Sequence, residues 1–405
     1  MNGPEPDQAI FPQPRDPRCP FDPPPELLRR LREAPISRMR IWDGSSAWVI
    51  TRYEDGKSVL GDDRFSADPR RPGFPEKNVA YATTIGQDRN LRTMDNPEHD
   101  VMKRMMVRDF TAHRVNEIRP YIQQLVDQLL DDMVRKGPPA DLVTDLAKAL
   151  PTMIICELLG VPYESRHFFW VEAKQLLAAP TAEAAAAAGE RLNAFVEQLI
   201  DLKTATPGND LISRLVHEQV LPGRLTRAEV LSVTRLILVA GHNTTASMIG
   251  LSCLLLLRSP EVASELRATT DPAVIRNAVD EMFRYLGTNH GGRRRVAVAD
   301  VEIGGQTIRA GEGVIVMNNI MDRDETVFPD AAHFDIHRPN TRANVAFGYG
   351  IHQCPGQLLA RAELQTVHAT LWKRLPTLRL AAPSEALTFV EDGPSYQVAS
   401  VPVSW

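Results

Sequence analysis

The chain has few cysteines and no segment that marks export or membrane insertion. Its 405 residues include four cysteines at irregular spacing, so we expect no disulfide framework and a reducing, cytoplasmic location. The first residues contain no basic region followed by an apolar run, so no signal peptide is expected. The most apolar segment, residues 236–257, is interrupted by a polar stretch at 241–245. It is therefore expected to be a buried core helix and not a membrane span.

No strong excess of charge is present either. The net charge is −5 and charged residues make up 24% of the chain, so the charge balance gives no indication of a nucleic-acid partner. Apolar residues account for 43%, which is ordinary for a globular enzyme. The length would suffice for two average domains, but no internal repeat and no long Gly/Ser linker divides the sequence. We therefore predict a single domain over residues 1–405.

Helical patterns dominate the chain from about residue 93, and strand patterns occur near both ends. Two short apolar segments around an Asp-Gly pair at 43–44 predict a β-hairpin within a β-rich part at about 35–65. A helical core is expected at about 93–290. Helices are predicted at residues 115–135, 142–159, 181–204 and 227–259, and further strands at about 296–316 and 378–405. The fold class is thus mainly α with a small β-rich lobe.

One cysteine has unusual neighbours. Residues 347–356 read Phe-Gly-Tyr-Gly-Ile-His-Gln-Cys-Pro-Gly, and a helical pattern follows. The glycines allow a tight turn and a close approach to a ligand, and Pro355 suits the first position of a helix. Cys354 would then lie at a helix N-terminus, where free N–H groups favour a thiolate. An isolated cysteine is more often a small buried apolar residue, but a thiolate so placed can be a strong axial ligand for a metal.

This segment resembles the haem-binding loop of the cytochrome P-450 family. The shared pattern Phe-Gly-x-Gly-x-His-x-Cys-x-Gly fixes six of ten successive positions. The resemblance extends over nearly the whole chain and implies the P-450 fold, with haem b as cofactor. It implies that Cys354 ligates the iron and pushes electron density toward O–O cleavage. The loop residues that it assigns to the cofactor are Phe347, Gly348, His352, Cys354 and Gly356.

Glu281 and Arg284 form a second signature. Their three-residue spacing puts the carboxylate and the guanidinium on one helix face, which alone indicates a surface ion pair of little energetic value. The motif also resembles the Glu-x-x-Arg of the P-450 family, in which the pair is buried and locked by a third basic residue. Residues 334–339 match that later segment, with Arg338 as the third member. The resemblance implies that the three residues hold the core that presents Cys354.

The third signature, Ala-Gly-His-Asn-Thr-Thr at 240–245, lies within the apolar segment. A Thr inside a helix can bond back to an earlier carbonyl and bend the helix. Gly241 leaves room for a bulky group, which could be a ligand or a crossing helix. The stretch resembles the oxygen-activation motif of the family, in which Thr244 organises dioxygen and the waters that carry protons to it. It also supplies Thr245 as a catalytic candidate and Ala240 and His242 as candidate substrate contacts.

Asn243 departs from the family pattern, which has an acidic residue at this catalytic position. Asn donates and accepts hydrogen bonds but cannot release and regain a proton as a carboxylate does. General acid–base help from a side chain is worth roughly 10²–10⁴-fold in rate. We therefore expect proton delivery through Thr244, waters and either His242 or a substrate group, or a chemistry other than ordinary hydroxylation.

The two propionates of haem need cationic partners, and the resemblance supplies four. The Pro-Glu-His of residues 97–99 together with Lys103 resembles Pro-Glu-His-x-x-x-Arg of the family, with Lys in place of Arg. His352 matches the His of the cysteine loop, and Arg295 matches the Arg that precedes a short strand. His99, Arg295 and His352 are therefore expected to bind the propionates. Lys103 would do so as a point charge without the planar fork of Arg.

Arg295 is preceded by Arg293 and Arg294, where family members usually have apolar residues in a loop that lines the substrate pocket. Three interpretations compete: a solvated basic turn, an anion site for the substrate formed by Arg293 or Arg294, and a surface that docks an acidic partner. Arg71 also lies near the region that lines the pocket in the family. Weaker pocket candidates are residues 81–88, 168–170 and 395–397.

The resemblance implies a soluble actinobacterial-type monooxygenase. It would insert one oxygen atom from O₂ into a small organic substrate of secondary metabolism or xenobiotic oxidation. Electrons would come from ferredoxin and ferredoxin reductase, with the ferredoxin docking near Lys103, Arg104 and Arg108. Two alternatives stay open. One is a P-450-type nitric oxide reductase or nitrating enzyme, which Asn243 and Arg294 would suit, and the other is a haem protein that senses or carries a ligand without turnover.

Overall fold

The chain groups into two compact units in a computed structural model. The model describes residues 7–78, 82, 89–165, 167–168, 171–172, 175, 181–391 and 395–405. The first unit comprises Met1–Gln87, Arg92–Glu98 and Asp271–Cys354, and the second comprises Asp88–Leu91, His99–Thr270 and Pro355–Trp405. Each unit is built from segments that are far apart in the sequence. The expectation of one domain over the whole chain remains a prediction.

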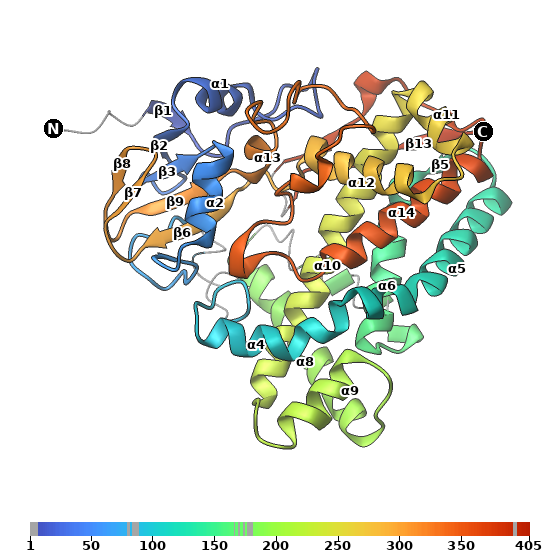
Figure 1. Ribbon diagram of the computed structural model, residues 1–405. Helices are drawn as coiled ribbons and strands as arrows, with labels where there is room; N and C mark the ends of the chain where they lie inside the picture. Colours follow the sequence, from blue (N-terminus) through green and yellow to red (C-terminus); the bar gives the residue numbers. More distant parts are fainter. Residues whose placement is uncertain are drawn as a thin grey trace. The chain divides into compact units, whose positions relative to one another are not determined.

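A six-stranded sheet forms the centre of the first unit. Its strands are β1 (Asp7–Ile10), β2 (Ile36–Arg40), β3 (Ser46–Ile50), β9 (Gly313–Val316), β6 (Arg293–Ala297) and β4 (Phe65–Ser66), in that spatial order. Strands β2 and β3 are antiparallel and are joined through Gly44, whose φ is +83°, so the predicted hairpin is confirmed. Strands β3 and β9 pair in parallel although more than 260 residues separate Trp48 from its partner Val314. The blue and orange strands lie side by side in Figure 1 for this reason.

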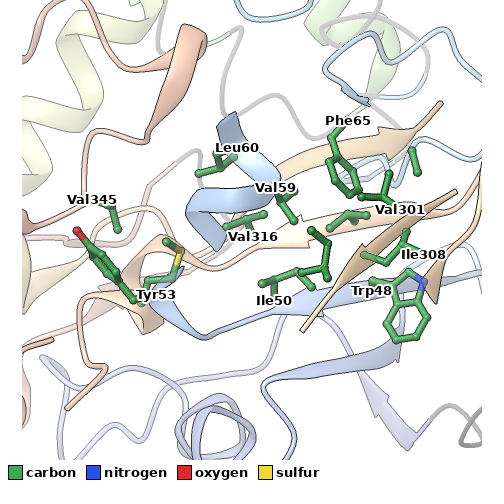
Figure 2. Packing of buried hydrophobic residues seen from close by; sticks show 14 of the residues in the cluster. Trp48, Ile50, Tyr53, Val59, Leu60, Phe65, Val301, Ile308, Val316 and Val345 are labelled. Carbon is green, nitrogen blue, oxygen red and sulfur yellow. The ribbon is translucent and has the colours of Figure 1, made fainter. Parts of the chain in front are cut away.

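Side chains alternate between two hydrophobic clusters on the two faces of this sheet. Val314 and Val316 belong to a cluster with Ile50, whereas Ile315 between them belongs to a cluster with Phe11. Helix α2 (Tyr53–Gly61) contributes to the first cluster. Figure 2 shows its Val59 and Leu60 packed over Val316 and Ile50. The other described elements of this unit are α1 (Pro25–Glu33), α12 (Pro272–Leu286), β7 (Val301–Ile303), β8 (Gln306–Ile308), α13 (Asn318–Met321), η6 (Thr341–Ala343) and η7 (Gly350–His352).

Helices dominate the second unit, as the sequence predicts. They are α4 (Glu98–Met106), α5 (Ala112–Lys136), α6 (Ala149–Leu159), α8 (Ala182–Ala205), α9 (Leu211–Leu215), α10 (Arg227–Leu257), α11 (Pro260–Ala268) and α14 (Gln357–Arg374). Short strands form two small sheets, β10 (Arg379–Leu380) with β13 (Pro402–Ser404) and β5 (Ala140–Asp141), and β11 (Phe389–Val390) with β12 (Gln397–Val398). The remaining turns are η2 (Val107–Phe110), η3 (Val143–Ala147), η4 (Tyr163–Ser165), η5 (Val216–Val220) and η8 (Ser384–Ala386).

Near α6 and near the cysteine loop, helix boundaries differ from the sequence-based expectation. The helix predicted at 142–159 is a π-helical turn, η3, followed by α6. The helix after the cysteine loop begins at Gln357 with Gly356 as its N-cap. Pro355 therefore lies in the preceding turn and not at the first helical position.

The long helix α10 begins at a capping box. The Thr226 hydroxyl accepts a hydrogen bond from the Glu229 N–H, and the Glu229 carboxylate accepts one from the Thr226 N–H. By length and composition, α10 is the one helix in the described part of the chain that could cross a membrane. In the protein, 67% of its most apolar window is buried, which is typical of a core helix.

Candidate functional site

The loop that carries Cys354 is held in a fixed shape by its own backbone. The Cys354 N–H donates to the Phe347 carbonyl at 2.9 Å, and the Gly348 N–H donates to the Val345 carbonyl at 2.8 Å. Gly348 and Gly350 have φ values of +83° and +72°, which other residues adopt only with strain. A Cβ atom at Gly350 would also lie 2.3 Å from the Leu60 carbonyl oxygen of α2. The loop thus lies directly against α2 and presents a half-buried Cys354.

Helix α12 supports the first residue of this loop. The rings of Phe283 in α12 and Phe347 have centroids 4.6 Å apart and planes tilted by 55°. Phe283 is 4% exposed, so the pair belongs to the core of the first unit. Phe283 was not among the site residues predicted from the sequence, although an aromatic residue between Glu281 and Arg284 was a visible signal.

The same helix carries a fully buried ion pair. The Arg284 guanidinium donates through Nε and Nη2 to the two Glu281 oxygens, both at 2.7 Å, and neither side chain is exposed. Arg338 donates from Nε to Glu281 Oε1 at 3.2 Å. The structure thus brings together the three residues that the sequence grouped. The remaining guanidinium donors reach backbone carbonyls of Asp322, Pro329, Asp330, Ala331 and His333. Such full satisfaction is what allows a charged cluster to exist in a core.

The first three residues of strand β6 are arginines, and their side chains lie in different surroundings. Arg295 is 6% exposed, and burial together with the charge of Arg293 lowers its pKa to about 10. Arg293 lies against the cysteine loop, because a Cβ atom at Gly348 would be 3.6 Å from its Nε. The pKa of Arg293 is lowered as well, because the effect of burial is larger than the opposing effect of the Cys354 sulfur.

Arg294 points to the opposite face of the sheet. Its guanidinium carbon lies 5.9 Å from the centroid of the Phe11 ring, and a Cβ atom at Gly291 would be 3.5 Å from its Nη1. Arg71, the other candidate substrate contact in this unit, has a side chain 49% exposed and lies 3.7 Å from the Asp95 carboxylate. These contacts do not bring Arg294 or Arg71 to the cysteine loop.

In the second unit, the centre of α10 is exposed on one side only. Ala240 and Thr244, one turn apart, are exposed, whereas Thr245 is 6% exposed and the following residues are buried. The Thr244 hydroxyl donates to the Ala240 carbonyl at 3.0 Å, which is the back-bond expected of a Thr within a helix. Asn243 is half-buried, and its carbonyl accepts from the Ser247 hydroxyl at 2.8 Å.

His242 lies between α10 and α6. Its Nδ1 is hydrogen-bonded to the Thr152 hydroxyl at 2.6 Å, and it is 4% exposed. Burial, with a smaller effect from the charge of Lys148, lowers its pKa to about 4. The imidazole is therefore neutral near pH 7. No sequence signal linked it to Thr152, which is 90 residues away.

Gly241 accommodates a crossing helix. A Cβ atom at this position would lie 2.6 Å from Cδ1 of Ile155 in α6. The sequence left open whether a ligand or a helix requires this glycine. The contact with α6 accounts for it without a ligand.

The remaining candidates are distributed as follows. His99 is 2% exposed and Lys103 is half-buried, and their i,i+4 spacing puts them on one face of α4. His352 lies in η7 and is half-buried. The Ser395 hydroxyl is 2.8 Å from that of Ser247 in α10. Phe168 is 40% exposed, whereas residues 81, 83–88 and 169–170 lie outside the described part of the chain.

The residues around Cys354 fit a haem. In the part of the chain that the structure describes, no cluster of three or more His, Cys, Asp or Glu side chains could hold a metal ion. Cys354 therefore offers a single thiolate, and an iron bound to it needs its other ligands from a larger group such as a porphyrin. Arg293 and Arg295, two residues apart on β6, supply positive charge suited to the carboxylates of such a group.

Comparisons with known proteins agree with this fit. The cytochrome P-450 family model matches residues 18–169 and 179–376. Cytochrome P-450-SU2 of Streptomyces griseolus is 45% identical over 401 residues, which cover 99% of this chain and 98% of that protein. Pentalenic acid synthase of Streptomyces avermitilis is 42% identical over 393 residues, 97% of this chain and 96% of that protein.

Solved structures give the same result. The crystal structure of GfsF has a TM-score of 0.92 at 40% identity and covers 98% of this chain and 100% of GfsF. The structure of mycinamicin VIII C21 methyl hydroxylase from Micromonospora griseorubida has a TM-score of 0.91 at 37% identity, with coverage of 98% and 100%. The predicted fold class and haem cofactor are thereby confirmed. The chain belongs to the cytochrome P-450 family and is a haem-thiolate monooxygenase.

Proposed function

We propose that this enzyme hydroxylates a small organic molecule of bacterial secondary metabolism in the cytoplasm, with Cys354 as the iron ligand. The observation that carries the proposal is the Cys354 loop, which is hydrogen-bonded within itself and supported by α2 and by Phe283 of α12. Two relatives support the substrate class by their names, pentalenic acid synthase and mycinamicin VIII C21 methyl hydroxylase. A further related structure was solved in complex with filipin I.

A haem bound at Cys354 would supply the chemistry by which O₂, two electrons and two protons convert a substrate C–H bond to C–OH and release the second oxygen atom as water. In this proposal Cys354 donates electron density as a thiolate. Among the residues expected to bind the haem carboxylates, Arg295 and His352 belong to the first unit, and His99 and Lys103 belong to the second. Glu281, Arg284 and Arg338 keep α12 in place, and α12 in turn keeps Phe347 and its loop in place.

Thr244 is the proposed proton-organising residue. Its hydroxyl hydrogen is used in the bond to the Ala240 carbonyl, so its oxygen is available to accept a hydrogen bond from water. His242 is neutral and bonded to Thr152, which favours a structural role over proton transfer. Asn243 orients water but does not titrate. Solvent protons therefore arrive through waters held at Thr244.

The electron donor in this proposal is an acidic ferredoxin, reduced by ferredoxin reductase. Arg104 and Arg108 are exposed on α4 and η2, and Arg108 makes an exposed ion pair with Glu218 at 3.2 Å. Val101 and Val107, on the same two elements, are 42% and 37% exposed. Basic side chains beside exposed apolar ones suit a transient, electrostatically steered partner. Arg104→Glu should slow reduction by ferredoxin most strongly at low salt.

The test combines ligand binding with turnover. The purified ferric protein is titrated with macrolides, terpenoid acids and neutral analogues of similar size, and displacement of the iron-bound water is read from the Soret band. Ligands that bind are then incubated with ferredoxin, ferredoxin reductase and NADPH. We expect a product that has gained one oxygen atom derived from O₂. Rapid haem reduction by NADH under nitric oxide without ferredoxin would overturn the proposal in favour of the nitric oxide alternative.

A further inference from the structure

Arg293 and Arg295 lie on one face of strand β6, and Arg294 lies on the other. In the pairing with β9, Arg293 is opposite Val316 and Arg295 is opposite Val314, whereas Arg294 is opposite Ile315. Residues directly opposite one another in a sheet share a face. The valines belong to the cluster that α2 contributes to, and Ile315 belongs to the cluster with Phe11.

The cysteine loop lies over the same face as these two arginines. Gly350 of the loop touches the Leu60 carbonyl of α2, and Gly348 touches Arg293, with 3.6 Å from an added Cβ to Nε and 3.8 Å to Cζ. Arg293 is therefore a neighbour of the iron-ligating loop.

The positive charge on this face is not balanced by protein carboxylates. Within the described residues, neither Arg293 nor Arg295 makes an ion pair, and the buried Nε of Arg293 has no hydrogen-bond acceptor. Asp95 is the acidic residue that acts on Arg295, but its oxygens already accept from the Ser66 hydroxyl and the Ala67 N–H. Burial of a guanidinium without an anion is costly. The two guanidinium groups on this face therefore need an anion that comes from a bound group and not from the protein itself.

We propose that Arg293 is a cofactor-binding residue that, together with Arg295, binds a carboxylate of the haem. The inference rests on the proposed role of Cys354, because iron ligation there brings the edge of the same group toward the arginines beside the loop. It adds a second guanidinium to the one expected from the family pattern. It also separates Arg293 from Arg294, which faces Phe11 and has no part in this site.

The test compares Arg293→Gln and Arg295→Gln with the matched control Arg294→Gln. The first readout is the rate at which ferric haem passes to an excess of apomyoglobin. Loss of one charge-assisted bond should speed this transfer about 10–100-fold for Arg293→Gln and Arg295→Gln, with Arg294→Gln unchanged. Arg293→Lys should restore part of the retention. The second readout is the haem midpoint potential, which should become more negative when Arg293 loses its charge, because a nearby cation favours the reduced state.

Two outcomes would contradict the proposal. If Arg293→Gln and Arg294→Gln release haem at the wild-type rate, the proposal is wrong. If Arg293→Gln leaves haem release unchanged but weakens binding of carboxylate ligands relative to neutral ones, Arg293 belongs to the substrate site instead. If Arg293→Gln fails to take up haem, Arg293→Lys supplies the measurement. The thiolate-type spectrum of the reduced carbon monoxide adduct is recorded for every variant. Absence of this spectrum in the wild-type protein would contradict the role of Cys354. If the spectrum is present and Arg293→Gln releases haem at the wild-type rate, only the role of Arg293 is contradicted.

Discussion

Phe283 and Phe347 link the buried ion pair of the first unit to the loop that carries the thiol. Their ring centroids are 4.6 Å apart. Phe283 lies on α12 between Glu281 and Arg284, which form the fully buried pair, and Phe347 is the residue whose carbonyl accepts from the Cys354 N–H. A change in the position of α12 is therefore transmitted to Cys354 through one aromatic contact and one hydrogen bond.

Phe283→Leu should loosen the cysteine loop without unfolding the protein. Aromatic pairs are worth about 0.5–1.5 kcal/mol beyond the area that they bury, so we expect a loss of roughly 1 kcal/mol in the free energy of unfolding. The fraction of reduced carbon monoxide adduct with a thiolate-type spectrum should fall. Phe168→Leu is the control, because Phe168 is 40% exposed. Equal spectra for the two variants would contradict the link.

Arg338→Ala should destabilise the protein severely. It removes one cation from Glu281 and empties a site where three carbonyls accept from the guanidinium. Removing one partner of a buried pair costs about 3–5 kcal/mol. Arg342→Ala is the matched control, because that side chain is 81% exposed and lies 3.8 Å from Asp280. It should change the free energy of unfolding, measured by denaturant titration, by no more than about 0.5 kcal/mol.

Asn243→Glu should increase the share of electrons that ends in product. A carboxylate at this position can pass protons, which Asn cannot, and we expect turnover to rise by up to about 100-fold, the lower limit of general acid–base effects. Product formed per NADPH consumed is the measurement. Asn243→Gln is the control, because Gln has the size of Glu but carries no titratable proton. If Gln and Glu give the same ratio, residue 243 does not limit proton delivery.

His242 should make the protein less stable in mild acid. Its pKa is about 4 in the folded state against 6.5 for the unperturbed group, so the unfolded state binds more protons between these values. Stability is therefore retained above about pH 6.5 and is lost as the pH falls toward 4, by about 3 kcal/mol in total. His242→Gln should remove this part of the pH dependence of unfolding. His113→Gln, at a side chain 87% exposed, should leave it unchanged.

Gly241→Ala should disturb the contact between α10 and α6. The added methyl would lie 2.6 Å from Ile155 Cδ1, and overpacking typically costs about 1–3 kcal/mol, against a gain of about 1 kcal/mol in helix propensity. Ile155→Val removes the opposing carbon and should recover most of the lost stability in the double variant. Additive free energies of unfolding in this double-mutant cycle would contradict the proposed helix contact.

Local features were readable from the sequence because they depend on neighbouring residues. The turns of the cysteine loop need glycines at 348 and 350, where φ is positive. The hairpin at β2 and β3 follows from alternation around an Asp-Gly pair. The three-residue spacing of Glu281 and Arg284 puts both on one helix face whatever surrounds that helix. Each of these is decided by covalent geometry over a few residues.

The surroundings of the three arginines and of His242 were decided only by the tertiary structure. The sequence predicted the strand from residue 296, but β6 begins at Arg293, and its pairing with β9 assigns Arg293 and Arg294 to opposite faces. Gly241 and His242 acquire their surroundings from α6, about 90 residues earlier in the chain. A sequence pattern specifies which face of an element a residue occupies, but which element packs on that face depends on the minimum free energy of the whole packed chain.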